Sequence, residues 1–113
     1  MLLRGRFVDL FRRVDVLVTR TVAITAFAAG TIGVDQIDGR KVDRHLGWSP
    51  FSWPINLAGL PAATVPCGRD RDGLPIGLQI VAPWLEEETI LAVAGAFEQV
   101  RPWAQAWPTF PRG

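Results

Sequence analysis

The stretch from Pro54 to Glu98, PINLAGLPAATVPCGRDRDGLPIGLQIVAPWLEEETILAVAGAFE, carries most of the signals that decide the fold. Two apolar runs, 62–65 and 76–81, flank a polar turn at 70–73 and predict two strands that pair as a hairpin. Three glutamates then open a segment with apolar residues at helical spacing, which predicts a helix over 86–100 that ends before Pro102. The prolines and glycines of 51–68 indicate a buried segment of tight turns around the first strand.

Upstream of this stretch, residues 2–13 have the spacing of an amphipathic helix, and 14–19 read as a short buried strand. Residues 30–48 are rich in Gly and charged residues and predict a polar surface loop. The tail, 101–113, is rich in Pro and Trp, and we expect Trp103 and Trp107 to anchor it. Three strands that are apolar on both faces need more cover than two helices give. We therefore expect residues 1–113 to form a single partial α/β domain with an incomplete core.

Composition excludes several classes of function. The chain has 113 residues with 12 Lys and Arg against 11 Asp and Glu, so it has no strong field to attract nucleic acid or an anionic membrane. No apolar run is long enough for a signal peptide or a membrane span. With only one Cys and one His, an internal disulfide and a closed zinc site are excluded. The sequence predicts a soluble cytoplasmic protein.

The 54–98 stretch also resembles the C-terminal region of amidase-signature enzymes. Residues 56–62 (NLAGLPA) match that family's Asn-Leu-x-Gly-x-Pro-Ala segment, 66–68 its Pro-Cys-Gly turn, and 73–79 (GLPIGLQ) its Gly-Leu-Pro-x-Gly-x-Gln strand. Residues 14–21 (VDVLVTRT) are similar to the family's Asp-x-Leu-x-x-Pro-Thr strand. Arg20 stands where the family usually carries Pro, so the loop that follows is expected to differ.

The resemblance implies an α/β/α fold around a mixed sheet, of which this chain would be the last quarter or so. It also implies hydrolysis of a small amide or ester through an acyl-enzyme, by a Ser-Ser-Lys triad and a Gly/Ser-rich loop that lie upstream of the matched region. We therefore expect no catalytic residue in this chain, no metal and no organic cofactor. The expected partners are a small-molecule amide substrate and the missing N-terminal part of the amidase, and the chain alone is expected to be inactive.

Local catalytic sets can be written from the residues present. Lys41 with Ser49 and Ser52 would give a Ser-Ser-Lys set, but Lys41 lies in the polar run GRKVDRH and a catalytic lysine must be desolvated to act as a base. Asp43, His45 and Ser49 would give a Ser-His-Asp set, but a polar loop favours a surface histidine.

A third possibility is nucleophilic catalysis by Cys67. The single histidine, His45, is 22 residues away in sequence, and no helix dipole is evident that would lower the pKa of the thiol. We expect a buried structural thiol instead.

The aromatic segment before Asn56 is the candidate substrate site. By resemblance it approaches the substrate side of related enzymes, and Ser49, Phe51 and Trp53 are the residues expected to touch substrate, with plain core packing as the alternative. Trp48 belongs to the same aromatic group. In the glutamine-using subunits that amidate tRNA-bound residues, an Asp often occupies the position of Ser49. A serine here favours a general amidase.

Two interpretations of other kinds remain open from the sequence. The chain could be a non-catalytic binding or structural domain that presents the aromatic surface of 48–53 to a ligand or a partner protein. It could also be the non-functional remnant of a broken amidase gene.

Overall fold

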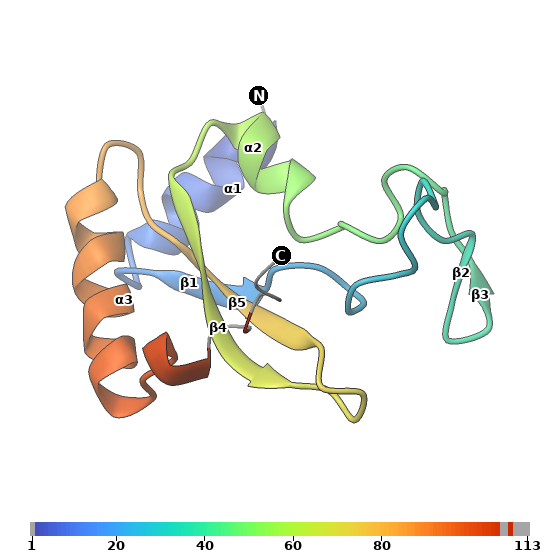
Figure 1. Ribbon diagram of the computed structural model, residues 1–113. Coiled ribbons are helices and arrows are strands. Elements are labelled where there is room, and N and C mark those ends of the chain that lie inside the picture. The colour runs from blue at the N-terminus through green and yellow to red at the C-terminus, as the bar shows by residue number, and fades with distance from the viewer. Residues whose placement is uncertain (1, 107–108, 110–113) are drawn as a thin grey trace.

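A small antiparallel sheet forms the centre of the computed structural model, which describes residues 2–106 and 109 (Figure 1). Its strands are β1 (Leu17–Arg20), β4 (Ala62–Arg69) and β5 (Pro75–Val81), in the order β1-β5-β4. The other elements are three helices, a 3₁₀ turn and a second, two-stranded sheet: α1 (Leu2–Phe11), α2 (Trp53–Ala58), α3 (Glu87–Val100), η1 (Ala104–Ala106), β2 (Gln36–Ile37) and β3 (Arg40–Lys41).

The β4–β5 hairpin confirms the expected pairing and is longer than predicted. Its turn is held by Asp70, whose carboxylate accepts hydrogen bonds from the amides of Asp72 and Leu74, both at 2.9 Å. The Thr25 hydroxyl and the Leu74 amide lower the pKa of Asp70 below its ordinary value of 3.8, because both stabilise the charged carboxylate. Gly73 closes the turn with φ at 82°, a conformation that suits glycine.

Helix α3 covers one face of the sheet, as the apolar spacing predicts. Ile90 packs there against Val65, Ile80 and Ala82, and these four form the buried core cluster. Partly buried apolar side chains surround it: Val16, Ala63, Leu78, Val93, Ala94, Phe97 and Trp103. Burying an aliphatic side chain stabilises a fold by about 1.5–3 kcal/mol. This interface is therefore the main source of stability in the described chain.

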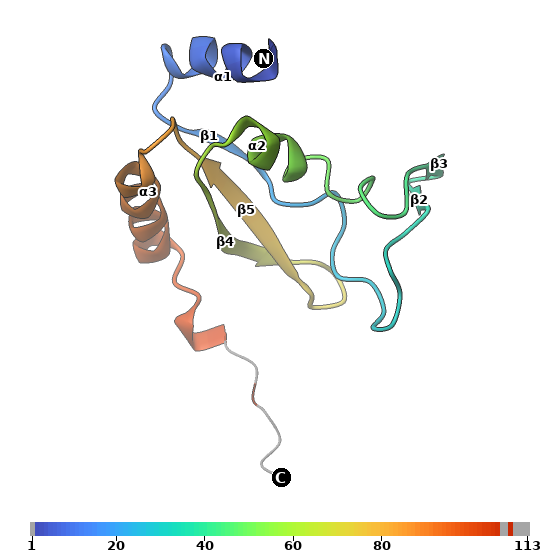
Figure 2. The same cartoon turned by 90° about the horizontal axis from the view of Figure 1, so that it is seen from above.

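Helix α2 lies on the opposite face of the sheet (Figure 2) and corrects the expectation of tight turns. Pro54 sits in its first turn, where a missing amide hydrogen costs no intrahelical bond. Gly59 ends it in the left-handed region at φ 71°, and the Leu60 amide donates to the Ile55 carbonyl at 3.2 Å. This is the usual glycine cap of a helix. Proline and glycine therefore mark the two ends of a short helix here, whose own buried residues are Ile55 and Ala58.

The upstream elements differ in detail from their predicted bounds. The first strand runs from Leu17 to Arg20 rather than over 14–19, and it pairs antiparallel with β5. Within the polar stretch 30–48, the β2–β3 hairpin forms around Asp38 and Gly39, whose φ angles are 48° and 75°. An Asp-Gly pair with two positive φ angles is a strong hairpin signal, and it was present in the sequence.

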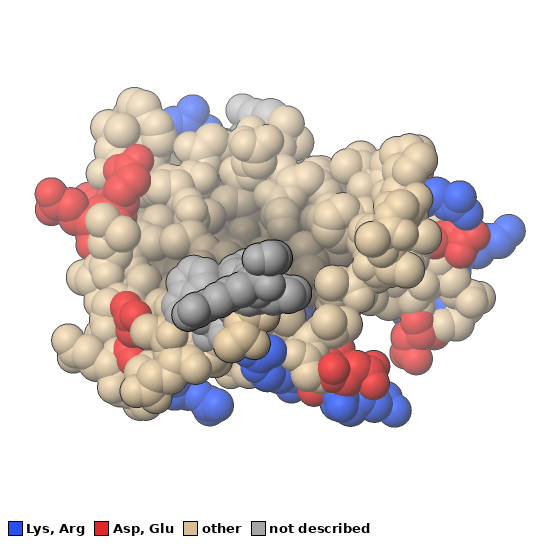
Figure 3. Space-filling model, in the orientation of Figure 1, with Lys and Arg blue, Asp and Glu red and all other residues tan. Residues whose placement is uncertain are grey.

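The core of the chain is incomplete, as the sequence predicts. Val18 on the sheet is 47% exposed, and Val100 at the end of α3 is 79% exposed. In the orientation of Figure 3 the charged side chains lie mainly at the rim of the molecule, around a hollowed, largely uncharged middle. The fold is a partial α/β structure with uncovered apolar faces.

The C-terminal segment is partly anchored. Trp103 packs against Phe97 of α3 with ring centroids 6.3 Å apart, which agrees with the expected anchor. The second expected anchor, Trp107, lies outside the described residues. Among the helices of the described chain, none combines the length and the apolar character that crossing a bilayer requires.

Candidate functional site

The candidate substrate residues lie together on the segment 48–53, which leads into α2, on the face of the sheet opposite α3. Ser49 and Phe51 are half-buried, and Trp53 is 45% exposed at the start of the helix. The Ser49 hydroxyl donates to the Leu46 carbonyl at 3.3 Å. These three residues therefore offer a half-buried ring, an exposed ring and one hydroxyl group within five positions of the chain.

A buried glutamine connects this segment to the sheet. Gln79 of β5 is only 5% exposed, and its Nε2 donates to the Phe51 carbonyl at 2.8 Å and to the Thr19 hydroxyl at 2.9 Å. The Thr19 hydroxyl donates in turn to the Arg20 carbonyl at 2.9 Å. Both hydrogens of the Gln79 amide are thus used, and its two partners come from different segments of the chain.

A second anchor lies beside the first. The Ser52 hydroxyl donates to the Thr21 carbonyl at 2.6 Å, and the Ala23 amide donates to the Trp48 carbonyl at 2.9 Å. The hydroxyls of Thr21 and Thr64 share a hydrogen bond of 2.9 Å across the sheet. Two main-chain carbonyls and the Ser52 hydroxyl therefore fix the segment to the strand β5 and to the residues that follow β1.

The side chain of Trp48 is half-buried and packs against the loop that precedes it. Its ring meets the edge of Phe27 with centroids 5.4 Å apart and planes at 80°. Its indole N–H is buried with no hydrogen-bond partner among the described residues. Gly33 lies so close that an added Cβ would sit 3.0 Å from that nitrogen and would also clash with the Arg44 carbonyl. These contacts fix the loop that leads into the 48–53 segment.

The local Ser-Ser-Lys set receives no support from the geometry. Lys41 is exposed on β3, in the hairpin that Figure 1 shows apart from the main sheet. The hydroxyls of Ser49 and Ser52 donate to main-chain carbonyls, those of Leu46 and Thr21. These serine hydroxyls therefore serve as local structural donors.

The geometry gives no support to the Ser-His-Asp set of Asp43, His45 and Ser49 either. The Asp43 carboxylate accepts hydrogen bonds from the amides of Leu46 and His45, at 2.8 and 2.9 Å. These two bonds lower the pKa of Asp43 because they stabilise its charged form. Asp43 thus organises a surface turn, and its contact with His45 is through the backbone rather than the imidazole.

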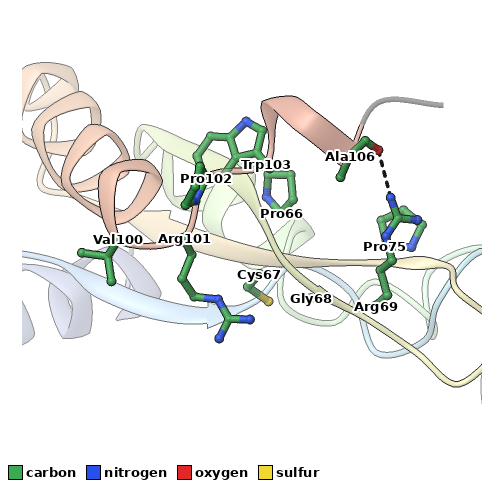
Figure 4. A pocket seen from close by; sticks show the side chains of 10 residues that line it. All are labelled: Pro66, Cys67, Gly68, Arg69, Pro75, Val100, Arg101, Pro102, Trp103 and Ala106. Carbon is green, nitrogen blue, oxygen red and sulfur yellow. Dashed lines mark hydrogen bonds between the residues drawn. The ribbon is translucent and has the colours of Figure 1, made fainter. Parts of the chain in front are cut away.

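A cavity of about 470 Å³ lies elsewhere, between the β4–β5 hairpin and the end of α3 (Figure 4). Cys67 and Trp103 are in its wall, and Arg69 braces it by donating to the carbonyls of Gly73 at 2.7 Å and Ala106 at 3.0 Å. The expectation of a buried thiol is corrected, because Cys67 is half-buried at a bulge of β4. No sequence signal indicated this cavity, since its walls come from distant segments.

Metal binding receives no structural indication in the described part of the chain, where no group of three His, Cys, Asp or Glu side chains converges. The structure therefore brings Ser49, Phe51 and Trp53 onto one short segment, and it adds Gln79, Ser52 and Thr21 as the residues that hold it. Sequence reasoning singled out Gln79 only as part of a motif.

Comparison with known proteins places these observations in a family context. Residues 1–91 match the family model described as Amidase. A glutamyl-tRNA(Gln) amidotransferase subunit from Thermosynechococcus vestitus (strain NIES-2133 / IAM M-273 / BP-1) is 43% identical over 107 residues, which are 95% of this chain and 21% of the relative. The chain thus spans about a fifth of the length of the curated relatives it matches.

Solved structures agree with the sequence match. A bacterial aryl acylamidase of the amidase-signature family superposes with a TM-score of 0.81 at 33% identity, covering 91% of this chain and 21% of that enzyme. The 6-aminohexanoate cyclic dimer hydrolase, solved with its substrate, superposes with a TM-score of 0.74 at 31% identity, covering 88% of this chain and 22% of that one.

Proposed function

This chain belongs to the amidase family, and from that premise we propose that it supplies the C-terminal part of a hydrolase acting on a small amide or ester. The observation that carries the proposal is the match of 95% of this chain to only 21% of its relative. Residues 2–106 form a partial fold whose apolar faces need the rest of such an enzyme as cover.

The chemistry would follow the acyl-enzyme route that the family resemblance implies. A serine oxygen from the upstream part bonds to the amide carbon, the C–N bond breaks, and the amine leaves with the proton relayed through a lysine and a second serine. Water then hydrolyses the acyl ester and frees the acid. This chain contributes no group to these steps and needs no metal or organic cofactor for them.

The role of this chain would be to form one wall of the substrate pocket. Trp53 is exposed enough to contact a substrate, and Phe51, two residues earlier in the chain, is half-buried. Ser49 is uncharged, and its hydroxyl already donates a hydrogen bond to the Leu46 carbonyl. A wall of two rings and a hydroxyl suits an uncharged amide with an apolar group, because a charged substrate end would find no opposite charge among these three residues.

The test uses a hybrid enzyme, in which this chain replaces the matching fifth of the bacterial aryl acylamidase. We expect Trp53→Ala in the hybrid to raise KM for an acyl nitroanilide about 3- to 10-fold with kcat little changed, because it removes apolar contact that is the same in the ground and transition states. Steady-state kinetics measure both constants.

Trp84→Ala is the matched control, because Trp84 is an exposed tryptophan that stacks on Arg4 outside the 48–53 segment. Its KM should equal that of the unsubstituted hybrid. An unchanged KM in Trp53→Ala, or an equal rise in both variants, would remove the 48–53 segment from the substrate pocket.

A further inference from the structure

The carboxamide of Gln79 is the most buried polar side chain in the described part of the chain. Its Nε2 has two hydrogens, and each is directed to an acceptor, the Phe51 carbonyl at 2.8 Å and the Thr19 hydroxyl at 2.9 Å. The Thr19 hydroxyl is an acceptor here because its own hydrogen goes to the Arg20 carbonyl. The orientation of the amide is therefore fixed by its partners, and no other uncharged side chain of this length supplies two such donors.

The hydrogen bond from Gln79 to the Phe51 carbonyl is important because of where it lies in the candidate substrate segment. The Phe51 carbonyl belongs to the residue just before Ser52, the N-cap residue of the helix that begins at Trp53. Gln79 itself stands on the central strand of the sheet, which pairs with both neighbours. The central strand of the sheet thus holds the main chain of the candidate substrate segment.

We propose that Gln79 is a positioning residue for substrate binding, which sets the place of Phe51 and Trp53 through the Phe51 carbonyl. The inference rests on the proposed function and deepens it, since it names the residue that controls how the pocket wall is placed. Ser52 supplies the second attachment through the Thr21 carbonyl at 2.6 Å. The two attachments act on neighbouring residues, Phe51 and Ser52, and losing the glutamine removes the one that fixes the Phe51 carbonyl.

The experiment compares Gln79→Met and Gln79→Glu in the hybrid enzyme. Methionine keeps the length of the side chain and removes both donors, and glutamate places a carboxylate against two acceptors. We expect both to raise KM for an acyl nitroanilide roughly 5- to 50-fold with kcat little changed, because a displaced wall weakens uniform binding. Gln99→Met, at an exposed position of α3, makes the same chemical change and should leave both constants unaltered.

Thr19→Val covers the case in which the Gln79 variants do not fold. It removes one of the two acceptors and keeps the bond to the Phe51 carbonyl, so we expect a smaller rise in KM of roughly 2- to 5-fold. A merely structural role would lower the fraction of active enzyme, and with it kcat, at an unchanged KM.

The outcomes separate this inference from the proposed function. A raised KM in Trp53→Ala together with an unchanged KM in the Gln79 and Thr19 variants would overturn the positioning role alone. If Trp53→Ala also leaves KM unchanged, the proposed pocket wall itself is wrong. A raised KM in Trp53→Ala and also in the Gln79 and Thr19 variants, with the KM of Gln99→Met unchanged, supports the positioning role.

Discussion

Replacing Gly77 by valine is expected to disrupt the sheet and to leave the hybrid enzyme without activity. A Cβ at Gly77 would lie 2.7 Å from the Thr21 hydroxyl and 2.9 Å from Cγ2 of Thr64, and the two methyl groups of valine add further crowding. The shared hydrogen bond of these threonines would also be broken. Overpacking with loss of one hydrogen bond costs about 2–4 kcal/mol, which is a large part of the stability of a small domain.

Gly68→Val is the matched control for this change, because Gly68 lies on the partner strand and its added Cβ would meet open space. Urea unfolding followed by tryptophan fluorescence, with activity on an acyl nitroanilide, measures both variants. We expect Gly68→Val to keep its free energy of unfolding within about 0.5 kcal/mol of the parent. Equal stabilities for the two variants would show that the packing at Gly77 is looser than described.

The isolated chain is expected to associate rather than to behave as a compact monomer of 12.4 kDa. Its apolar surface is spread over several elements, with Leu2 and Val8 on α1, Leu57 on α2 and Leu91 on α3 all at least half exposed. The strand β1 also ends the sheet with an unpaired edge among the described residues. Uncovered apolar faces and free strand edges both favour self-association.

Light scattering coupled to size-exclusion chromatography measures this directly, and binding of the dye ANS reports loose apolar surface. We expect a mass well above that of the monomer, or a monomer that binds the dye strongly. The hybrid enzyme is the control, because there the same faces are covered, and it should be monodisperse and bind little dye. A dilute monomer of this chain with sharp, dispersed amide resonances would contradict the incomplete core.

The parts of the fold that the sequence predicted are those with local causes. The β4–β5 hairpin follows from two apolar runs around a polar turn, and α3 follows from its acidic start and apolar spacing, so each could be read from a short stretch of neighbouring residues. The prolines and glycines of 51–68 predict tight turns in place of helix α2, because Pro54 and Gly59 break a helix at interior positions; a proline in the first turn and a glycine just past the last are compatible with one. The β2–β3 hairpin lies in a stretch whose composition predicts a loop, although the Asp38-Gly39 pair indicates a hairpin turn.

The residues of the candidate site could be proposed from the sequence, but the hydrogen bonds that hold them could not. Ser49, Phe51 and Trp53 are neighbours in the chain, so their closeness needed no fold. Their attachment did, because Gln79 is 28 residues from Phe51 and Ser52 is 31 residues from Thr21. Periodicity and composition carry no information on hydrogen bonds between such distant residues.

Restoring activity by supplying this chain is the most direct test of its role as the C-terminal part of an amidase. The bacterial aryl acylamidase is truncated to remove the fifth that this chain matches, and hydrolysis of an acyl nitroanilide is measured for the truncated enzyme, for this chain, and for the two combined or fused. We predict no hydrolysis by either part alone and turnover from the combination, abolished when the catalytic lysine of the upstream part is replaced. Hydrolysis by this chain alone that is lost in Lys41→Ala, or no turnover from a well-folded fusion, would contradict that role.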